Sequence, residues 1–592
     1  VIAAPRGPLL VVAGAGAGKT ETMAARVVWM VANRLVRPDE VLGLTFTRKA
    51  AQQLAQRIRQ RLSRLAGSDL VTRLDPSGDL RRDLVSGEPE VSTYHAYAGR
   101  LLDRYGMVLP LEPATSLVSD TELWQIAFRV VSDWDGHIDT DKIPSTVTQH
   151  VLALSGQLAE HLVDPADLAA VRDALAVLVA TLPPGPSQRD GDPTRPLTNV
   201  VSVQDDRIAL LPLVERVHEA LRREGRLDFG RQMSLAARLA ADHAEAGRAE
   251  RERFRLVLLD EYQDTGHSQR VLLSSLFGRA QDTALSVTAV GDPMQSIYGW
   301  RGASAANLPR FVTDFPAARR RGAAVLADRR FLSTSWRNPP EALVLANAVA
   351  SPLRDRGVAV EELTARPGAS SGDVRLALTT TADEEREWVA DVIAREYEDA
   401  RRRDDPPPTA AVLIRRNADA EPIAEVLRRR GLPVEVVGLG GLLRTPEVAD
   451  LVAVLRMLSD PLAGSAAVRV LTGARWQIGI ADLRALSRRA RAVAAGAGHG
   501  RTGAVTDVDD LAQALGEVLP GERSEESGLV DAIADPGDPS QYSAAGYARI
   551  TALGKELQAL RARLGQPLPG LVADVERVLG LGVEAGARTR YA

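Results

Sequence analysis

The sequence predicts an α/β protein with two parallel-sheet domains, each carrying a mainly helical insertion. Three observations support this fold class. Short β-rich runs alternate with helical patterns in the first part of the chain, which is typical of a parallel sheet covered by helices. A glycine-rich turn joins the first apolar run to a helix. The alternation of strands and helices resumes after about residue 370.

The first set of elements surrounds a helical stretch. Strands are expected at Leu9–Val12, Val41–Phe46, Phe254–Leu259 and Ser286–Val290, with a helix at Glu21–Met30 after the first strand. Between Leu101 and Arg253 the pattern is mostly helical, as at Asp167–Thr181 and Ile208–Arg223, apart from a turn-rich loop at Pro183–Pro196. We interpret this stretch as an insertion into the first α/β domain.

The second set of elements is shorter. Strands are expected at Val374–Leu378, Ala411–Ile414 and Val434–Gly438, separated by helices at Ala382–Arg403 and Ala418–Arg430. After about Ala463 the pattern is helical, with loops expected at Ala494–Gly503 and Asp535–Ser540. This arrangement predicts a second α/β domain followed by a second helical insertion.

Composition narrows the classes of function. The 592 residues include no cysteine, which excludes disulfides, thiolate metal sites and a cysteine nucleophile. The net charge is −4, so any nucleic-acid path must be made of local patches and stacking aromatics. No apolar run reaches the ~18 residues of a membrane span and no signal peptide is visible, so a cytoplasmic protein is the expectation.

The first chemical motif is the turn from Ala13 to Thr20. Strand, glycine loop, Lys-Thr and helix form a phosphate-binding arrangement, in which glycines let backbone N–H groups face phosphate oxygens. Lys19 would contact the β- and γ-phosphates, and the Thr20 hydroxyl would ligate Mg²⁺. Only four of the 73 basic residues are lysine. A chain that uses arginine nearly everywhere therefore keeps lysine where a compact ammonium group is needed. The alternative is a glycine-rich turn from strand to helix in which the lysine has no role in phosphate binding.

The second chemical motif is the run Val257–Asp264. A strand that ends in Asp260 and Glu261 places two carboxylates at the edge of the sheet where ligands bind in open α/β folds. Asp260 would hold Mg²⁺, and Glu261 would polarise an attacking water. Alone, the same run could be an exposed acidic turn.

Further motifs carry a family resemblance. Asp260–Asp264 and Gly291–Ala303 resemble motifs II and III of superfamily 1 DNA helicases of the UvrD/PcrA/Rep/RecB group. The phosphate-binding loop Ala13–Thr20, which starts with alanine where the general pattern has glycine, resembles the variant found in the same family. Thr45–Ala51 resembles motif Ia, Ser92–Tyr97 the next DNA-contacting segment, and Ser335–Asn338 motif IV. The resemblance covers most of residues 1–463 and implies two RecA-like P-loop motor domains.

The resemblance implies roles for individual residues. Gln295 would sense the γ-phosphate and Arg337 would contact it from the second motor domain, while Tyr298 would lie between nucleotide and DNA. ATP would be bound by these three residues together with Ala13, Gly14, Ala15, Gly16, Ala17, Gly18, Lys19 and Thr20. DNA would be contacted by Thr45, Phe46, Thr47, Tyr94, His95, Tyr298, Trp300 and Arg301. Phe46 and Tyr94 could instead be core aromatics.

The resemblance also implies a domain plan. The first motor domain would comprise residues 1–103 and 251–315, with a helical insertion at 104–250 between them. Residues 316–463 would form the first part of the second motor domain, and residues 464–592 would form a helical insertion after it.

Some details point to one branch of the family. The Gly291-Asp-Pro form of motif III resembles RecB-like helicase–nucleases, and Tyr262–His267 and Leu471–Gly479 resemble the AdnB motor of the actinobacterial AdnAB helicase–nuclease. The adenine-contacting glutamine motif would precede Val1, and motifs V and VI would follow Ala592. We therefore expect this polypeptide by itself to hydrolyse ATP poorly.

The predicted function is ATP- and Mg²⁺-dependent 3′→5′ translocation on single-stranded DNA with duplex unwinding in repair or recombination. The AdnB resemblance implies processing of double-strand break ends, with an AdnA-like helicase–nuclease subunit as partner. One alternative is a stand-alone UvrD-type repair helicase without a nuclease. A second is a non-catalytic subunit that binds ATP or DNA as a clamp, which the complete set of phosphoryl-transfer residues disfavours.

Overall fold

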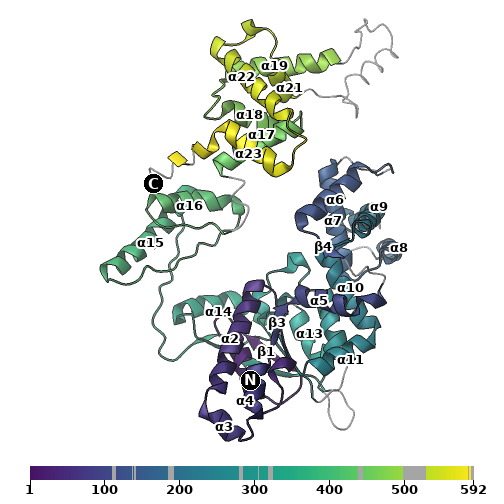
Figure 1. Ribbon diagram of the computed structural model, residues 1–592, viewed down its shortest axis with the longest axis vertical. Coiled ribbons are helices and arrows are strands. Elements are labelled where there is room, and N and C mark those ends of the chain that lie inside the picture. Colours follow the sequence, from purple (N-terminus) through teal and green to yellow (C-terminus); the bar gives the residue numbers. More distant parts are fainter. Residues whose placement is uncertain are drawn as a thin grey trace. The chain divides into compact units, whose positions relative to one another are not determined.

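The computed structural model describes residues 1–109, 115–136, 138, 140, 142–183, 193–278, 284–304, 306–317, 325–437, 445–497, 528–583 and 586–587. The chain forms two compact units, Val1–Arg375 and Leu376–Ala592 (Figure 1). Residues 184–192 of the loop expected at Pro183–Pro196 and residues 498–503 of that at Ala494–Gly503 lie outside the described residues, whereas Arg195, Pro196 and residues 494–497 are helical.

The first unit is built on a six-stranded parallel sheet. Its order is β3-β2-β6-β7-β1-β8, with β1 at Leu9–Ala13, β2 at Val41–Thr45, β3 at Glu90–Thr93, β6 at Leu256–Leu259, β7 at Ser286–Gly291 and β8 at Asp328–Leu332. Leu9 of β1 lies opposite Thr288 of β7 and Asp328 of β8. The predicted α/β class and the four strands of the first set are confirmed.

Alternate residues of each strand enter two separate cores. In β1, Leu10 and Val12 pack on one face, whereas Leu9 and Val11 pack on the other. Both faces are apolar because helices cover both, as expected for a parallel sheet. One face carries α1 (Lys19–Ala32), α2 (Arg48–Ala66), α3 (Asp69–Leu74) and α4 (Asp79–Ser86). The other carries α5 (Tyr94–Tyr105), α10 (Phe229–Asp242), α11 (Ala244–Arg253), α12 (His267–Leu273) and α13 (Asn307–Asp314).

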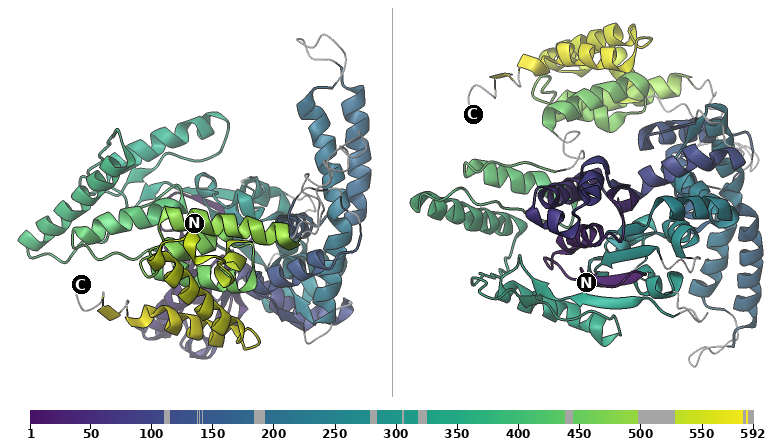
Figure 2. Two further views of the ribbon diagram at one scale, coloured as in Figure 1. Left: turned by 90° about the horizontal axis from the view of Figure 1, so that it is seen from above. Right: turned by 60° about the horizontal axis from the view of Figure 1, so that its bottom comes forward.

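Part of the predicted insertion is a helical cluster with its own core, whereas α10 and most of α11, which also lie within 104–250, pack on the sheet. The helical cluster contains α6 (Asp120–Ser132), α7 (Pro144–His161), α8 (Pro165–Thr181) and α9 (Arg195–Arg223). Val151 of α7 and Leu213 of α9 are fully buried in this cluster. The strands β4 (Ser116–Leu117) and β5 (Arg226–Leu227), which flank these helices in the sequence, pair in a two-stranded parallel ladder. Figure 2 shows α8 and α9 as two long helices side by side, away from the sheet.

The first unit ends with segments that follow β8. β9 (Thr334–Ser335) pairs in parallel with β10 (Thr364–Ala365), and α14 (Pro340–Asp355) lies between them in sequence. The sequence plan assigned β8 and β9 to the second motor domain, whereas β8 is the sixth strand of the first sheet. The five-part domain plan itself stays a prediction.

The three strands expected after residue 370 are wrong as far as the structure describes them. Residues 374–378, 411–414 and 434–437 form no regular element and have no ladder partner among the described residues, and Gly438 lies outside that part. A strand needs a neighbour for its backbone N–H and C=O groups. Residues 411–414 and 434–437 pack through side chains on helices α15 (Ala382–Arg402) and α16 (Ala420–Arg429) instead, whereas residues 374–378 are exposed.

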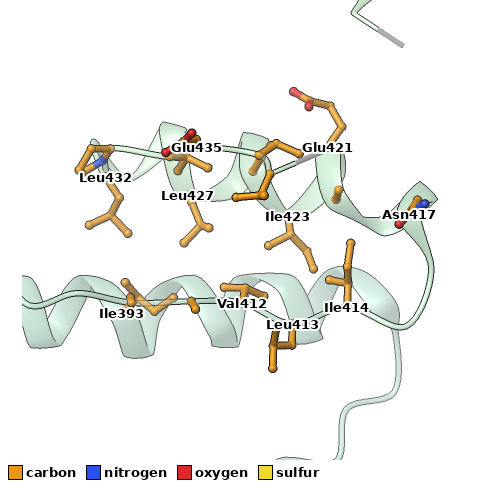
Figure 3. Close-up of a pocket in the computed structure, with 18 of the residues that line it drawn as sticks. Ile393, Val412, Leu413, Ile414, Asn417, Glu421, Ile423, Leu427, Leu432 and Glu435 are labelled. Carbon is orange, nitrogen blue, oxygen red and sulfur yellow. The ribbon is translucent and has the colours of Figure 1, made fainter. Parts of the chain in front are cut away.

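An apolar cavity of about 550 Å³ separates two of these segments. Figure 3 shows Ile423, Leu427 and Leu432 pointing from the α16 side toward the stretch that carries Val412 and Ile414. Leu413 is 96% exposed, so one side of that stretch is covered and the other is not. The alternating apolar residues from which a strand was predicted are therefore packed on only one side of this stretch.

The remaining helices of the second unit form an independent core. They are α17 (Pro446–Ser459), α18 (Gly464–Thr472), α19 (Ile480–Ala497), α21 (Leu529–Ala534), α22 (Ala544–Arg561) and α23 (Leu568–Leu579). Met457, Leu471 and Val575 are fully buried in this cluster. The expectation that the chain becomes helical after Ala463 is confirmed for its described part.

Candidate nucleotide site

The glycine loop runs from the end of β1 into α1. Gly16 and Gly18 have φ of +75° and +83°, a left-handed region that costs a residue with a Cβ about 1–2 kcal/mol. Helix α1 begins at Lys19, and no side chain caps its first turn. Uncapped N–H groups at a helix N-terminus favour an anion, so the loop has the geometry that phosphate binding requires.

The strand β6 delivers the two predicted carboxylates to the same edge of the sheet. Asp260 is 6% exposed and accepts hydrogen bonds from the Glu261 N–H (3.1 Å) and the Thr45 hydroxyl (3.4 Å). Its carbonyl oxygen accepts one from the Tyr94 hydroxyl (2.9 Å). These contacts fix the strand end on which the site depends.

Glu261 and Lys19 meet across the site. Lys19 Nζ lies 3.2 Å from Glu261 Oε2, and the two side chains are 12% and 35% exposed. Glu261 has a φ of +50°, which is rare for a residue with a side chain and costs of order 1–3 kcal/mol. This turn directs the carboxylate back toward the loop lysine. Lys19 is therefore shared between Glu261 and any phosphate that enters.

Burial perturbs two acidic groups of the site. Burial, with a contribution from Glu261, raises the pKa of Asp260 to about 7, against the opposing pull of Lys19. Burial also raises the pKa of Asp264 to about 6. A bound cation would reverse this effect on a neighbouring carboxylate. The excess of acidic groups over Lys19 is thus suited to a divalent cation.

The residues present fit Mg²⁺ and a nucleoside triphosphate. Asp260 and the Thr20 hydroxyl offer hard oxygen ligands, which Mg²⁺ prefers together with substrate phosphates. Lys19 and the first turn of α1 offer positive charge and N–H donors to those phosphates. The prediction that residues 13–20 and 260–261 form one site stays a proposal for binding, but the structure brings these elements together.

The segment that carries Arg337 contacts the glycine loop directly. Ser335 donates from its hydroxyl to the Ala15 carbonyl (3.0 Å), and the Trp336 N–H donates to the Gly16 carbonyl (2.9 Å). A Cβ placed on Gly16 would lie 2.9 Å from the Arg337 Cβ. Arg337 thus lies close to the glycine loop within the same compact unit, and its side chain is exposed.

The segment after β7 carries Gln295 and an aromatic pair. Gln295 donates from Nε2 to Asp292 Oδ2 at 2.6 Å. The rings of Tyr298 and Trp300 are 6.4 Å apart, and Trp300 is 74% exposed. An exposed indole can stack on a base without reading sequence. The side chain of Arg301 lies outside the described residues.

Two expected DNA contacts do not fit the structure. Thr45 and Tyr94 are both 1% exposed, and their hydroxyls hold Asp260 instead of facing solvent. Thr45 is the last residue of β2, which pairs with β6, and Tyr94 begins α5 directly after β3, so both hydroxyls reach the end of β6. Phe46 is half-buried with its ring 4.9 Å from that of Tyr94, so it keeps a partly open face.

Thr47 and His95 occupy more open positions. Thr47 is exposed and caps α2 by accepting from the Ala50 N–H at 3.1 Å. The His95 ring lies edge-on to Phe229, with centroids 5.9 Å apart. Phe229 is 41% exposed at the start of α10, and sequence reasoning missed it. No local pattern marks it, because the contact joins residues far apart in the chain.

Gln263 and Ser335 were also missed as site residues. Gln263 is 1% exposed and touches Glu261, Asp264 and Asp292. Its position two residues after Glu261 was a usable signal. Ser335 is fully buried, and it reaches the loop because it follows β8, which pairs with β1.

Two family models match the chain. Residues 1–316 match the UvrD/REP helicase N-terminal domain, and residues 331–495 match the UvrD-like helicase C-terminal domain. No helix in the described part of the chain has the length and apolar character to cross a membrane.

Several curated proteins are similar along most of the chain. ATP-dependent DNA helicase UvrD1 of Mycobacterium tuberculosis is 28% identical over 80% of this chain and 53% of its own length. ATP-dependent DNA helicase PcrA of Leuconostoc citreum is 26% identical over 81% and 54%. DNA helicase II of Escherichia coli is 26% identical over 83% and 58%. The chain spans about half the length of these relatives.

Proposed function

Because this chain belongs to the UvrD/REP helicase family, we propose that it is the motor part of an ATP-dependent DNA helicase that translocates 3′→5′ on single-stranded DNA. The observation that carries the proposal is the meeting of Lys19 and Glu261 at 3.2 Å, where an uncapped helix start faces two carboxylates. The relatives' names support the activity, since they are ATP-dependent DNA helicases.

In this proposal each residue has one task. Mg·ATP, when bound, supplies the phosphoryl group that water accepts. Lys19 neutralises charge on the phosphates, and Thr20 and Asp260 hold the cation. Glu261 orients the water and accepts its proton once Lys19 turns to the phosphates. Arg337, which follows the segment bonded to the loop, stabilises charge on the transferring group.

Movement on DNA would follow from the segment after β7. Gln295 registers the γ-phosphate, and Trp300, five residues later, stacks on a base. Phe46, Thr47 and His95 extend the DNA path over the exposed ends of α2 and α5, because they sit where strands β2 and β3 give way to these helices. Stacking contributes ~1–3 kcal/mol per base and tolerates any sequence, as translocation requires.

The cellular role is the finer part of the proposal. The resemblance of Tyr262–His267 and Leu471–Gly479 to AdnB supports cytoplasmic processing of double-strand break ends with an AdnA-like partner. A stand-alone UvrD-type repair helicase is equally compatible with the relatives. The two differ in nuclease activity, so degradation of linear duplex DNA by the purified full-length protein and its partners separates them.

The central test is ATP hydrolysis with and without single-stranded DNA. We expect strong stimulation by DNA in the full-length protein and its loss in Lys19→Ala and Glu261→Gln. Lys555→Ala and Glu245→Gln serve as matched controls, because both alter the same residue types outside the site: Lys555 lies on α22, and Glu245 is exposed on α11 and pairs with Arg248. Activity that is indifferent to Lys19 or to DNA would leave the clamp alternative in place of the motor.

A further inference from the structure

A buried glutamine joins the catalytic carboxylate to the segment that carries Gln295. Gln263 lies in the short helical turn Tyr262–Asp264, and its side chain is 1% exposed. Its Nε2 donates to Glu261 Oε2 (2.9 Å) and to Asp264 Oδ2 (3.1 Å). Its Oε1 accepts from the Asp292 N–H (3.0 Å). The carboxamide therefore donates two hydrogen bonds and accepts one.

The orientation of this carboxamide has only one solution. A flipped group would set its oxygen against the oxygens of Glu261 and Asp264, and its NH₂ against the N–H of Asp292. Each flipped contact would lose a hydrogen bond and place like partial charges together. The network therefore fixes the amide as donor toward Glu261 and acceptor toward Asp292.

The contacts continue from Asp292 to Gln295. Asp292 is 3% exposed and accepts from the Met294 N–H (3.0 Å) and from Gln295 Nε2 (2.6 Å). The Ser296 hydroxyl donates to the Gln263 carbonyl at 3.2 Å. An unbroken chain of hydrogen bonds thus runs from Glu261 through Gln263 and Asp292 to Gln295.

A glycine makes this close approach possible. A Cβ on Gly291 would lie 2.5 Å from Gln263 Oε1 and 3.2 Å from the Gln263 backbone nitrogen. The end of β7 is therefore shaped around the glutamine side chain. The alternative, that Gln263 only fills space, does not explain a carboxamide whose donor and acceptor ends both meet charged or backbone partners.

We propose that Gln263 is a positioning residue that couples the Glu261 carboxylate to the Gln295 carboxamide. The inference rests on the proposed function, because it assigns Glu261 to water activation and Gln295 to the γ-phosphate. When Glu261 leaves Lys19 to bind water, Gln263 follows its hydrogen-bond acceptor and moves Asp292 and Gln295 with it. Hydrolysis and the position of the DNA-contacting segment become linked through one side chain.

The first test does not depend on activity. Hydrogen–deuterium exchange of the nucleotide-free full-length protein is compared for wild type, Gln263→Ala and Gln269→Ala. Gln269 is the matched control, since it is 6% exposed and accepts from the Gly266 N–H (3.2 Å) without touching Asp292. We expect Gln263→Ala alone to speed exchange of the peptide covering 290–296 by about tenfold, as loss of one buried hydrogen bond implies. Unchanged exchange in that peptide would overturn the proposal.

The second test separates coupling from folding. In DNA-stimulated hydrolysis, Gln263→Ala is expected to lower kcat at least about tenfold while the KM for ATP changes less than about threefold. Gln263→Ala/Gln295→Ala is expected to be no slower than Gln295→Ala alone, because both substitutions break the same chain. Additive losses, or a matching rise in KM, would contradict coupling. A wild-type protein without DNA-stimulated activity would refute the proposed function, and the exchange experiment would still decide the role of Gln263.

Discussion

Glu160 of α7 is held between two glycines, and the glycines predict different responses to the same substitution. Its carboxylate accepts from the Ser268 N–H (3.4 Å) and the Ser268 hydroxyl (3.1 Å) at the start of α12. A Cβ on Gly266 would lie 1.8 Å from Glu160 Oε1, and one on Gly302 would lie 2.5 Å from Glu160 Cγ. Alanine at either position must displace the Glu160 side chain.

The cost of that displacement can be worked out from the contacts. Moving the carboxylate breaks its bonds to Ser268, which is fully buried, and hydrogen bonds to a charged group contribute about 1.5–3 kcal/mol to stability. Gly266 has an ordinary φ of −84°, so Gly266→Ala should cost only this amount. Gly302 has a φ of +86°, which adds about 1–2 kcal/mol for a residue with a Cβ. Gly302→Ala should therefore cost about 2.5–5 kcal/mol.

A double-mutant cycle with Glu160→Ala isolates the two contributions. In that background, Gly266→Ala should become nearly neutral, whereas Gly302→Ala should retain about 1–2 kcal/mol of destabilisation. The assay is urea unfolding followed by circular dichroism, with Gly156→Ala on the solvent side of α7 as a control, since a Cβ there meets nothing within 4 Å. If Gly266→Ala keeps its full cost without Glu160, the steric reasoning is wrong.

Three further predictions concern single side chains. Burial lowers the pKa of His218 to about 3, and its ring is bonded to the Ser155 hydroxyl at 2.9 Å. Because the unfolded chain binds this proton near pH 6.5 and the folded chain does not, stability is full above pH 6.5 and falls between pH 6.5 and 3, by about 2 kcal/mol from pH 7 to 5. Urea unfolding of His218→Gln should show a shallower pH slope than wild type, and an unchanged slope would contradict the assignment. Trp300→Ala should weaken single-stranded DNA binding by ~1–3 kcal/mol in fluorescence anisotropy, with the affinity for ATP retained, and an unaltered DNA affinity would remove Trp300 from the path. Tyr94→Phe should cost about 0.5–1.5 kcal/mol of unfolding free energy through its lost bond to Asp260 and should leave DNA affinity unchanged, whereas weaker DNA binding would restore the expected contact.

The sequence predicted those parts of the fold whose pattern is local. Leu9–Val12 and Ser286–Val290 are apolar runs bounded by turns, and both are strands of the buried sheet. The turn at Gly16 and Gly18 has positive φ angles that favour glycine, so the sequence predicted its conformation. Lys19 and Glu261 were assigned to one site from their motifs, whereas their 3.2 Å ion pair was not predicted.

The features that failed depend on neighbours distant in the chain. Leu413 and Val437 have the character of strand residues, but they are 96% and 92% exposed because nothing in the described part of the chain covers the side of the segment on which each lies. Tyr94 was expected on the DNA face, yet it packs inward because its ring joins the core at the start of α5 and its hydroxyl bonds the Asp260 carbonyl, which is distant in the chain. Gln263 was passed over because its partner Asp292 follows another strand.

The position of β1 within the sheet has a consequence for biosynthesis. β1 leaves the ribosome well before its neighbours β7 and β8, which begin about 280 and 320 residues later. At roughly 5–20 residues per second, the nascent apolar segment waits about 14–56 s for its first partner. During that interval an unpaired, uncharged strand is available to chaperones or to other nascent chains. The strand that leads into the proposed phosphate loop thus needs protection while the chain is being made.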